Sequence, residues 1–323
     1  MDLPAPTFSF HLPSVHDDCQ LECRLYLPRQ HQNIESASNS SIRGAIVAHP
    51  YAPLGGCYDD PIVAFVGGEL LQAGYIVVTF NFRGAGSSEG RTSWTGKPEL
   101  GDYVSVYGFM LNYLQELHST LASSQNIAPS EAIHLVIGGY SFGSLIASHV
   151  PTLDVMLDLF CNGPTTPTTP IYTIIQAARK IATQSTQHLP PAKQNPETNQ
   201  ADQPAPRAAT TISYLLVSPL LPPVSQLLTA FSALSVNVGG KASAQARPAG
   251  RPTDQLSAHR TLALFGDQDT FTSARKLQRW SAEIGRMPQT GFRGCEIEGA
   301  GHFWRENGVE TRARRTLQEW LRS

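Results

Sequence analysis

Three residues of this chain have side chains that together could cleave an activated carbonyl compound: a serine, a histidine and an aspartate. Ser141 lies in the pattern Gly-Tyr-Ser-Phe-Gly, between an apolar run that predicts a buried strand and a helix-compatible segment. This order predicts a serine on a tight bend above a sheet, with glycines where strand and helix backbones nearly touch. A G-x-S-x-G pattern occurs by chance in roughly one chain in ten of this size, so its partners decide the prediction.

The other two residues supply what a serine needs to react. A serine hydroxyl is a weak nucleophile unless an imidazole removes its proton and a carboxylate orients that imidazole. His302 follows the last predicted strand, Asp269 follows the strand before it, and the order serine, acid, histidine is the one expected for this bend. The backbone N–H groups of Tyr51 and Phe142 are expected to form the oxyanion hole.

Other reactive residues near these positions have simpler explanations. Asp267 is the alternative acid, but it sits inside the turn, where a short carboxylate commonly hydrogen-bonds the backbone, so we assign the role to Asp269. Four further residues are expected to be structural or uninvolved: His49, His134, Arg83 and Cys57.

The elements that must position these residues alternate between strand and helix. An opening hairpin is expected from 8–12 and 19–27, and five later strands are expected at 44–48, 75–80, 133–137, 212–217 and 261–265, with a last one at 292–297. Helical spacing is found at 61–71, 99–118, 145–149, 171–183, 222–231, 273–284 and 308–321. The alternation predicts an α/β fold with a mostly parallel sheet and crossover helices.

The middle of the chain does not follow this alternation. Residues 161–258 are rich in Pro, Thr, Gln and Ala, and 184–210 and 239–254 are expected to be flexible because they cannot bury enough apolar surface to offset their ordering entropy. Strands that the sheet needs lie beyond this stretch, so it is expected to interrupt one domain, 1–323, as a cap or a disordered linker.

Composition and net charge limit the binding partners and the cellular compartment that we expect for this chain. The chain has 323 residues, is 41% hydrophobic and carries a net charge of -2, which gives no electrostatic basis for binding nucleic acid or an anionic membrane. No leader pattern or apolar run of membrane-spanning length is visible, so we expect a cytoplasmic protein. The five cysteines form no C-x-x-C pair, so neither a disulfide framework, a metal site nor a cofactor is expected.

Beyond these separate observations, the motifs as a set resemble those of the α/β-hydrolase superfamily, in its small single-domain serine hydrolase branch. The resemblance covers roughly 44–149 and 261–321, and rests on five motifs: His49-Pro50 with Gly55-Gly56, F-N-F-R-G-A-G-S-S-E-G at 80–90, the G-Y-S-F-G bend at 139–143, G-D-Q-D at 266–269 and G-A-G-H-F at 299–303.

That resemblance implies an eight-stranded, mostly parallel sheet with helices on both faces. It also implies hydrolysis of an ester, thioester or amide through an acyl-enzyme on Ser141, with His302 and Asp269. The leading hypothesis is a serine hydrolase that cleaves a carboxylic ester or thioester of a small acyl substrate. Two alternatives stay open: an acyltransferase or lyase of the same fold, and a binding protein without catalysis. The oligomeric state and the acyl and leaving groups are not indicated.

Overall fold

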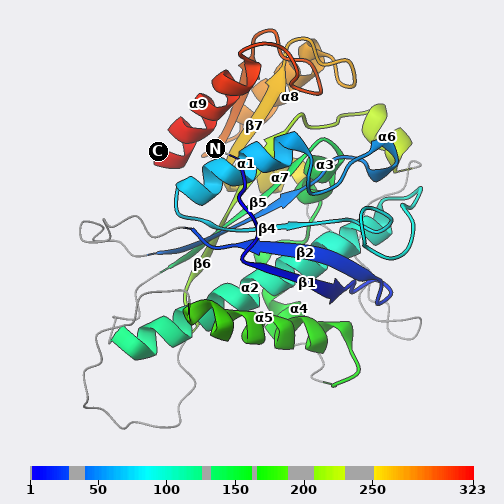
Figure 1. Cartoon of the computed structure of the whole chain (residues 1–323). Helices are drawn as coiled ribbons and strands as arrows, with labels where there is room; N and C mark the ends of the chain where they lie inside the picture. Colours follow the sequence, from blue (N-terminus) through cyan, green and yellow to red (C-terminus); the bar gives the residue numbers. More distant parts are fainter. Residues whose placement is uncertain (1, 29–40, 126–131, 162–165, 188–206, 230–250) are drawn as a thin grey trace.

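The computed structural model describes residues 2–28, 41–125, 132–161, 166–187, 207–229 and 251–323, which form a sheet flanked by helices (Figure 1). Its strands are β1 (Phe8–Pro13), β2 (Gln20–Tyr26), β3 (Ile42–Ala48), β4 (Ile76–Phe80), β5 (Ile133–Tyr140), β6 (Thr210–Val217), β7 (Arg260–Gly266) and β8 (Phe292–Ile297). Its helices are η2 (Ala52–Leu54), α1 (Pro61–Gln72), α2 (Lys97–Gln125), α3 (Phe142–Ser148), α4 (Leu153–Cys161), α5 (Pro170–Thr186), α6 (Val224–Leu228), α7 (Pro252–Ala258), α8 (Ala274–Gly285) and α9 (Val309–Arg322).

The eight strands lie in the order β1-β2-β4-β3-β5-β6-β7-β8. The hairpin β1–β2 is antiparallel and joins β4 antiparallel, whereas every pairing from β4 to β8 is parallel. The predicted α/β fold with a mostly parallel sheet is therefore confirmed. Parallel strands carry their C-terminal ends to one edge, where binding and catalytic groups of such sheets gather.

Helices cover both faces of the sheet because alternate residues of each strand point to opposite sides. On β3, Ile46 and Ala48 belong to the core that α2 covers, whereas Ala45 and Val47 belong to the core that α1 and α9 cover. All four side chains are at most 1% exposed. The continuous apolar run of this strand thus reflects burial on two faces.

Strand β5 is longer than the predicted 133–137, because it continues through two glycines to Tyr140. Gly138, Gly139 and Tyr140 pair in register with Leu215, Leu216 and Val217 of β6. The glycines end the apolar pattern, but they keep the backbone close to its neighbours: a Cβ on Gly138 would lie 3.0 Å from the Ile46 carbonyl oxygen. The strand therefore runs directly into Ser141.

Two short helices were absent from the sequence prediction. Helix α4 starts just after Pro151, and its buried Met156 and Phe160 pack with α2 in the core. Helix α7 begins at Pro252, so the expected flexibility of 239–254 is wrong for its last residues; the remainder, 239–250, lies outside the described residues. Pro252 stands at the first helical position of α7, where proline is favoured.

The predicted helix at 171–183 is present as α5, and its C-terminal end corrects a second boundary. Residues 184–186 were expected to be flexible, but they complete α5, because Ser185 is buried and accepts a hydrogen bond of 2.9 Å from the Tyr113 hydroxyl. Thr210 likewise already belongs to β6, and residues 188–206 of the expected flexible stretch lie outside the described residues.

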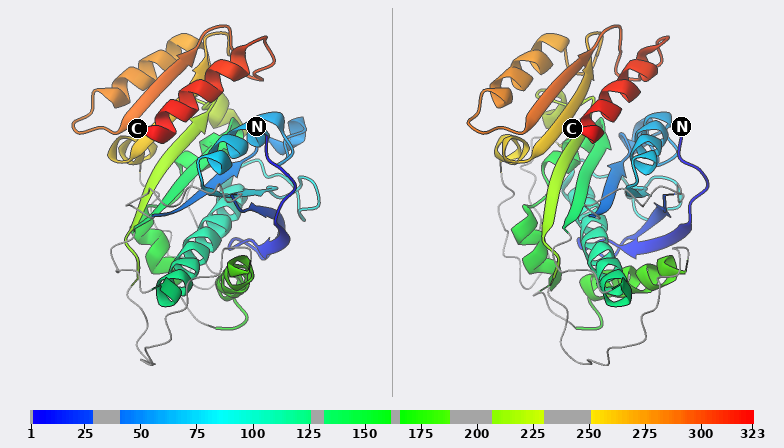
Figure 2. Two further views of the ribbon diagram at one scale, coloured as in Figure 1. Left: turned by 60° about the vertical axis from the view of Figure 1, so that its left-hand side comes forward. Right: turned by 90° about the vertical axis from the view of Figure 1, so that its left-hand side faces the viewer.

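The central stretch does not act as one unit over the C-terminal edge of the sheet. Helix α5 packs against α2 and β1, and Figure 2 shows it beside α2, far from α8 and α9. Strand β6 from the same stretch is a central strand of the sheet. None of the helices in the described ranges is long and apolar enough to cross a membrane.

A buried arginine ties the hairpin, the loop after β4 and helix α2 together. Arg83 donates to both carboxylate oxygens of Asp102, at 2.9 and 2.6 Å, and its guanidinium also reaches Asp17 and Ser14. The Asp102 side chain is fully buried. Burial alone would lower the pKa of Arg83, but the carboxylates of Asp102 and Asp17 outweigh it and raise that pKa. The expectation that Arg83 is structural agrees with these contacts.

We expect Arg83→Met to lower the free energy of unfolding by about 3–5 kcal/mol, because it leaves the Asp102 carboxylate buried without its positive partner and with only the backbone N–H of residue 83 as a donor. The double variant Arg83→Met, Asp102→Asn removes the orphaned charge and should be less destabilised than the single variant. Urea unfolding at neutral pH measures both. A double variant at least as unstable as Arg83→Met would contradict this explanation.

Candidate active site

Ser141 occupies a strained bend between β5 and α3. Its φ of 55° and ψ of -115° are rare for a residue with a side chain, and such strain persists only where packing enforces it. The flanking glycines show why the bend is tight: a Cβ on Gly139 would lie 2.4 Å from the Gly143 carbonyl carbon, and one on Gly143 would lie 2.5 Å from the Ala48 carbonyl oxygen. The predicted glycine requirement has this physical cause.

The structure brings together the serine, histidine and aspartate that follow β5, β8 and β7. The Ser141 Oγ lies 2.8 Å from the His302 Nε2, and the His302 Nδ1 lies 2.7 Å from the Asp269 Oδ2. A carboxylate only accepts hydrogen bonds, so Nδ1 carries the proton. The Nε2 lone pair then accepts from the Ser141 hydroxyl. This arrangement allows the imidazole to remove the serine proton.

Backbone donors fix the Asp269 carboxylate. Its Oδ1 accepts from the N–H groups of Phe271, at 2.8 Å, and Thr272, at 3.0 Å, which leaves Oδ2 for the imidazole. Asp267, the alternative acid, instead accepts at 2.7 Å from the Gly299 N–H and joins the turns after β7 and β8. Of the two aspartates, Asp269 contacts His302, whereas Asp267 bonds the turn after β8 and not the backbone of its own turn as expected.

Three residues that the sequence analysis did not identify position the histidine. The Phe271 ring stacks on the His302 ring with centroids 4.2 Å apart, and the Tyr140 hydroxyl donates to the His302 carbonyl oxygen at 2.9 Å. Trp304 donates through Nε1 to the Ser218 Oγ at 2.8 Å, and the Ser218 hydroxyl in turn lies 3.5 Å from the His302 carbonyl oxygen. Each of the three lies within two residues of Asp269, Ser141 or His302 in the sequence. That proximity is the only sequence signal that could have indicated them.

The sequence analysis assigns an oxyanion hole to two backbone N–H groups, those of Tyr51 and Phe142. In the described part of the chain, the N–H groups of Tyr51 and Phe142 have no hydrogen-bond partner. Phe142 is the first residue of α3, whose initial N–H groups lack an intrahelical acceptor. The Tyr51 and Phe142 rings are 5.2 Å apart, so their two loops are adjacent.

His49 holds the Tyr51 loop in place. The Phe82 N–H donates to the His49 Nε2 at 2.9 Å, so the proton must sit on Nδ1, which donates to the Pro50 carbonyl oxygen at 2.6 Å. The ring is fully buried, and burial lowers the pKa of His49 to about 4. His134 is also structural, because it joins the Tyr75 hydroxyl to the Ser213 Oγ within the sheet.

A cavity of about 390 Å³ opens at Ser141 and His302. We call it the Ser141 pocket. Its walls are mostly apolar and include Leu220 and Val224, near α6. The only described residues of the central stretch that line it are Leu220 and residues of α6.

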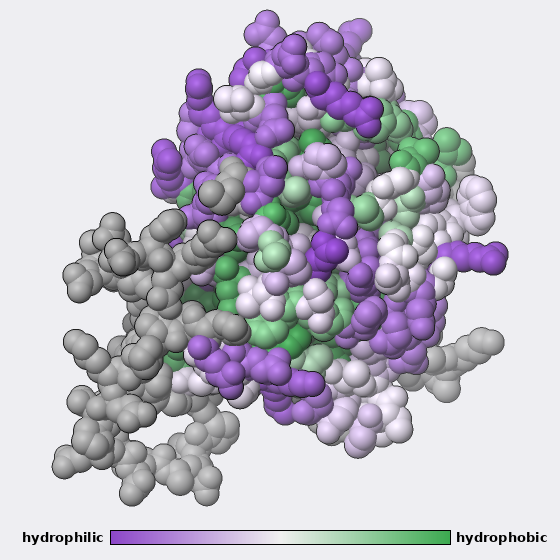
Figure 3. All heavy atoms as spheres, viewed as in Figure 1, coloured by the Kyte–Doolittle hydropathy of each residue, from purple (hydrophilic) through white to green (hydrophobic). Residues whose placement is uncertain are grey.

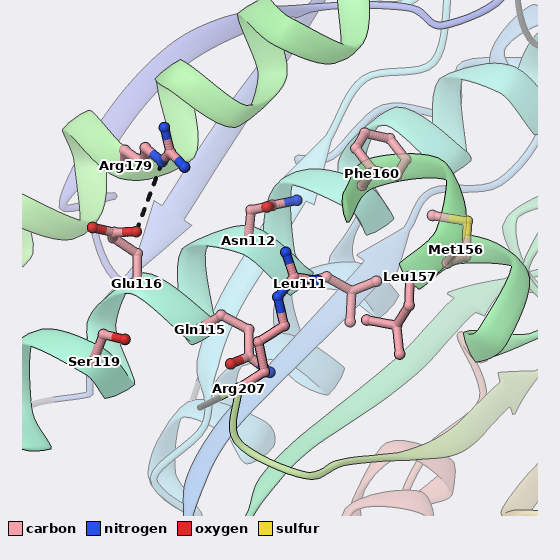
Figure 4. Close-up of a pocket in the computed structure, with 10 residues that line it drawn as sticks. All are labelled: Leu111, Asn112, Gln115, Glu116, Ser119, Met156, Leu157, Phe160, Arg179 and Arg207. Atoms are coloured by element: carbon pink, nitrogen blue, oxygen red, sulfur yellow. Dashed lines mark ion pairs between the residues drawn. The ribbon is translucent and has the colours of Figure 1, made fainter. Parts of the chain in front are cut away.

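A second cavity, of about 380 Å³, lies between α2, α4 and α5 and shares no lining residue with the Ser141 pocket (Figure 4). Its floor includes Met156 and Phe160, and Arg179 lies 3.8 Å from Glu116 at its edge. Its described lining includes no histidine, so no base for a nucleophile is found among those residues. Nor do the described residues hold a group of three or more His, Cys, Asp or Glu side chains arranged for a metal ion.

The buried state of His49 gives a pH prediction. Between pH 6.5 and about 4 the imidazole is protonated in the unfolded chain but neutral in the folded one, so the free energy of unfolding falls as the pH falls. The pKa difference corresponds to roughly 3 kcal/mol near pH 4. His49→Gln keeps an acceptor for the Phe82 N–H but loses the imidazole ring, so the wild type should have the larger free energy of unfolding at pH 7.5. The variant has no imidazole at this position to protonate, so the wild type should lose most of that difference by pH 4. Urea unfolding at several pH values measures the difference, and a difference independent of pH would contradict the prediction.

Comparisons with known proteins agree with this geometry. A model of the Alpha/beta hydrolase family matches residues 46–314, which is most of the chain. A comparison with curated proteins gives no match.

Among solved structures, a putative alpha/beta hydrolase from Agrobacterium tumefaciens is 16% identical and aligns over 98% of this chain and 95% of its own, with a TM-score of 0.52. An alpha-beta serine hydrolase homologue from Coxiella burnetii is 18% identical over 98% of both chains, with a TM-score of 0.49. At such identities the similarity concerns the fold.

Proposed function

We propose that this chain, which belongs to the alpha/beta hydrolase family, cleaves a carboxylic ester or thioester through an acyl-enzyme on Ser141. The observation that carries the proposal is the unbroken hydrogen-bond chain from the Ser141 Oγ through His302 to Asp269. All three residues are at most 7% exposed. Little water competes for these hydrogen bonds, so each group is held in its reacting orientation.

In the first half of the reaction, Oγ attacks the acyl carbon while His302 takes the serine proton. The carbonyl oxygen becomes negative and is stabilised by the N–H groups of Tyr51 and Phe142. His302 then gives its proton to the leaving oxygen or sulfur, the bond to that atom breaks, and the alcohol or thiol departs. Asp269 stays ionised throughout and stabilises the imidazolium.

In the second half, water takes the place of the leaving group. His302 removes a proton from the water molecule as its oxygen attacks the acyl carbon, and the same N–H groups stabilise the second oxyanion. The proton then passes to the Ser141 Oγ as the acyl bond breaks, which releases the carboxylic acid. The net reaction consumes one water molecule and needs no cofactor.

Ser141→Ala should lower turnover on the order of a million-fold, the loss typical of a triad nucleophile. The variant should also fail to react with a fluorophosphonate probe that labels the wild type, while its unfolding curve stays close to that of the wild type. A panel of p-nitrophenyl esters and acyl thioesters of increasing chain length gives the activity. Retained turnover of these esters in the purified variant would refute the serine mechanism.

The two aspartates of the 266–269 turn form a matched pair of tests. Asp269→Asn should lower turnover by up to about ten-thousand-fold, because the amide favours the wrong imidazole tautomer. Asp267→Asn keeps an acceptor for the Gly299 N–H and should retain most activity with a small loss of stability. Steady-state kinetics on one ester compares them, and the reverse ranking would refute the assignment of Asp269.

A further inference from the structure

Large apolar side chains that face solvent are concentrated around the Ser141 pocket. In the described ranges four such side chains are exposed: Leu54 at 69%, Leu227 at 69%, Phe303 at 48% and Trp94 at 80%. The first three all line the Ser141 pocket. Single exposed apolar residues are ordinary, but a group around one opening marks an interaction site. We call Leu54, Leu227 and Phe303 the apolar collar.

The apolar collar comes from three separate parts of the fold. Leu54 ends η2 after the Tyr51 loop, Leu227 lies in α6, and Phe303 directly follows His302. In Figure 3, which has the orientation of Figure 1, apolar residues gather at the edge where α6 lies. Local sequence therefore does not explain the group, since only the folded chain brings the three side chains to one opening.

Apolar surface continues from the apolar collar to the nucleophile. The Phe303 ring meets the Phe271 ring edge-on at 5.8 Å, and the Phe271 ring stacks on His302. On the α6 side, Val224 and Leu228 line the pocket beside Leu227. A molecule that covers the apolar collar thus borders the same surface that leads to Ser141.

The charges around the pocket indicate what kind of molecule covers the apolar collar. Among the described residues that line the pocket, two side chains besides His302 carry charge, Asp60 and Arg305. Asp60 caps α1 by accepting from the Ile62 N–H at 2.8 Å, and the Arg305 guanidinium lies 5.3 Å from the Phe303 ring. The signs are opposite, and the whole chain has a net charge of -2. An anionic surface would therefore not be attracted electrostatically. An uncharged surface would contact mainly apolar side chains.

We propose that the apolar collar seats this protein on an uncharged lipid surface, from which an ester with an aliphatic acyl chain enters the Ser141 pocket. A folded protein bound to the apolar collar would block the entry of substrate into the pocket. A lipid surface bound there would itself contain the substrate. Burial of apolar side chains at the boundary of the lipid provides the binding. The delivery of an ester depends on the proposed function, but the binding does not.

Binding is tested without turnover, in the Ser141→Ala background, by flotation with phosphatidylcholine vesicles. We expect the protein to float with the vesicles, and the triple variant Leu54→Ser, Leu227→Ser, Phe303→Ser to lower the bound fraction at least fivefold. Trp94→Ser is the matched control, since it removes an exposed apolar side chain that does not line the pocket, and it should bind as the parent does. No flotation of the parent, or an equal loss in the control, would overturn the proposal.

Delivery is tested with active protein on two esters, soluble p-nitrophenyl acetate and emulsified p-nitrophenyl laurate. The triple variant should lower the ratio of the laurate rate to the acetate rate at least tenfold, whereas Trp94→Ser leaves the ratio unchanged. An unchanged ratio in the triple variant would refute delivery through the apolar collar. If wild type hydrolyses neither ester, the proposed function fails for these esters, while flotation still decides the binding.

A second copy of the chain is the competing occupant of the apolar collar. In that case the wild type would elute as a dimer in size-exclusion chromatography, the triple variant would elute as a monomer, and vesicles would not bind the parent. That combined result overturns the proposal. A monomer that floats with vesicles supports it.

Discussion

The site depends on one steric constraint, the close approach of β5, α3 and β3 around Ser141. Glycines at 139 and 143 allow strand and helix backbones to lie almost in contact, with the Ala48 carbonyl of β3 packed against the second. The serine between them is thereby held at a positive φ that its side chain disfavours. The cost of this strain is met by the buried strands around it. The result is an Oγ that stands at the C-terminal edge of the sheet with its position already fixed.

The position of the Ser141 Oγ also fixes the hydrogen bonds and the tautomer of His302. The imidazole is placed between one acceptor-only group, Asp269, and one hydroxyl, Ser141, so a single tautomer satisfies both contacts. Asp269 is itself fixed by two backbone donors. The ring of Phe271 covers one face of the imidazole. Preorganisation of this kind means that little reorientation remains for the reaction step.

The central stretch contributes to the fold in two unrelated ways. Helix α5 is a packing element of the α2 face, whereas α6 forms a wall of the Ser141 pocket and contributes Leu227 to its rim. Strand β6 between them completes the sheet. The described parts of this stretch therefore belong to the core, the sheet and the pocket wall. Its composition, rich in Pro, Thr, Gln and Ala, does not indicate which part has which role. Among the described residues, the lining of the Ser141 pocket includes α6 and the loops that carry Leu54 and Phe303.

The sequence by itself determined the fold class and the three polar residues at the strand ends, because alternating strand and helix patterns and glycine-bounded turns are local signals. It missed α4 and α7, which depend on packing, and it ended β5 too early, because glycines carry no apolar signal. The sequence also favoured Asp269 over Asp267 by their places in the turn, but only the tertiary structure gave the contacts of each: Asp269 with His302, and Asp267 with the Gly299 N–H. The apolar collar was equally invisible, because its three residues are far apart in the chain. Contacts between distant segments are set by the packing of the whole sheet, which no local pattern encodes.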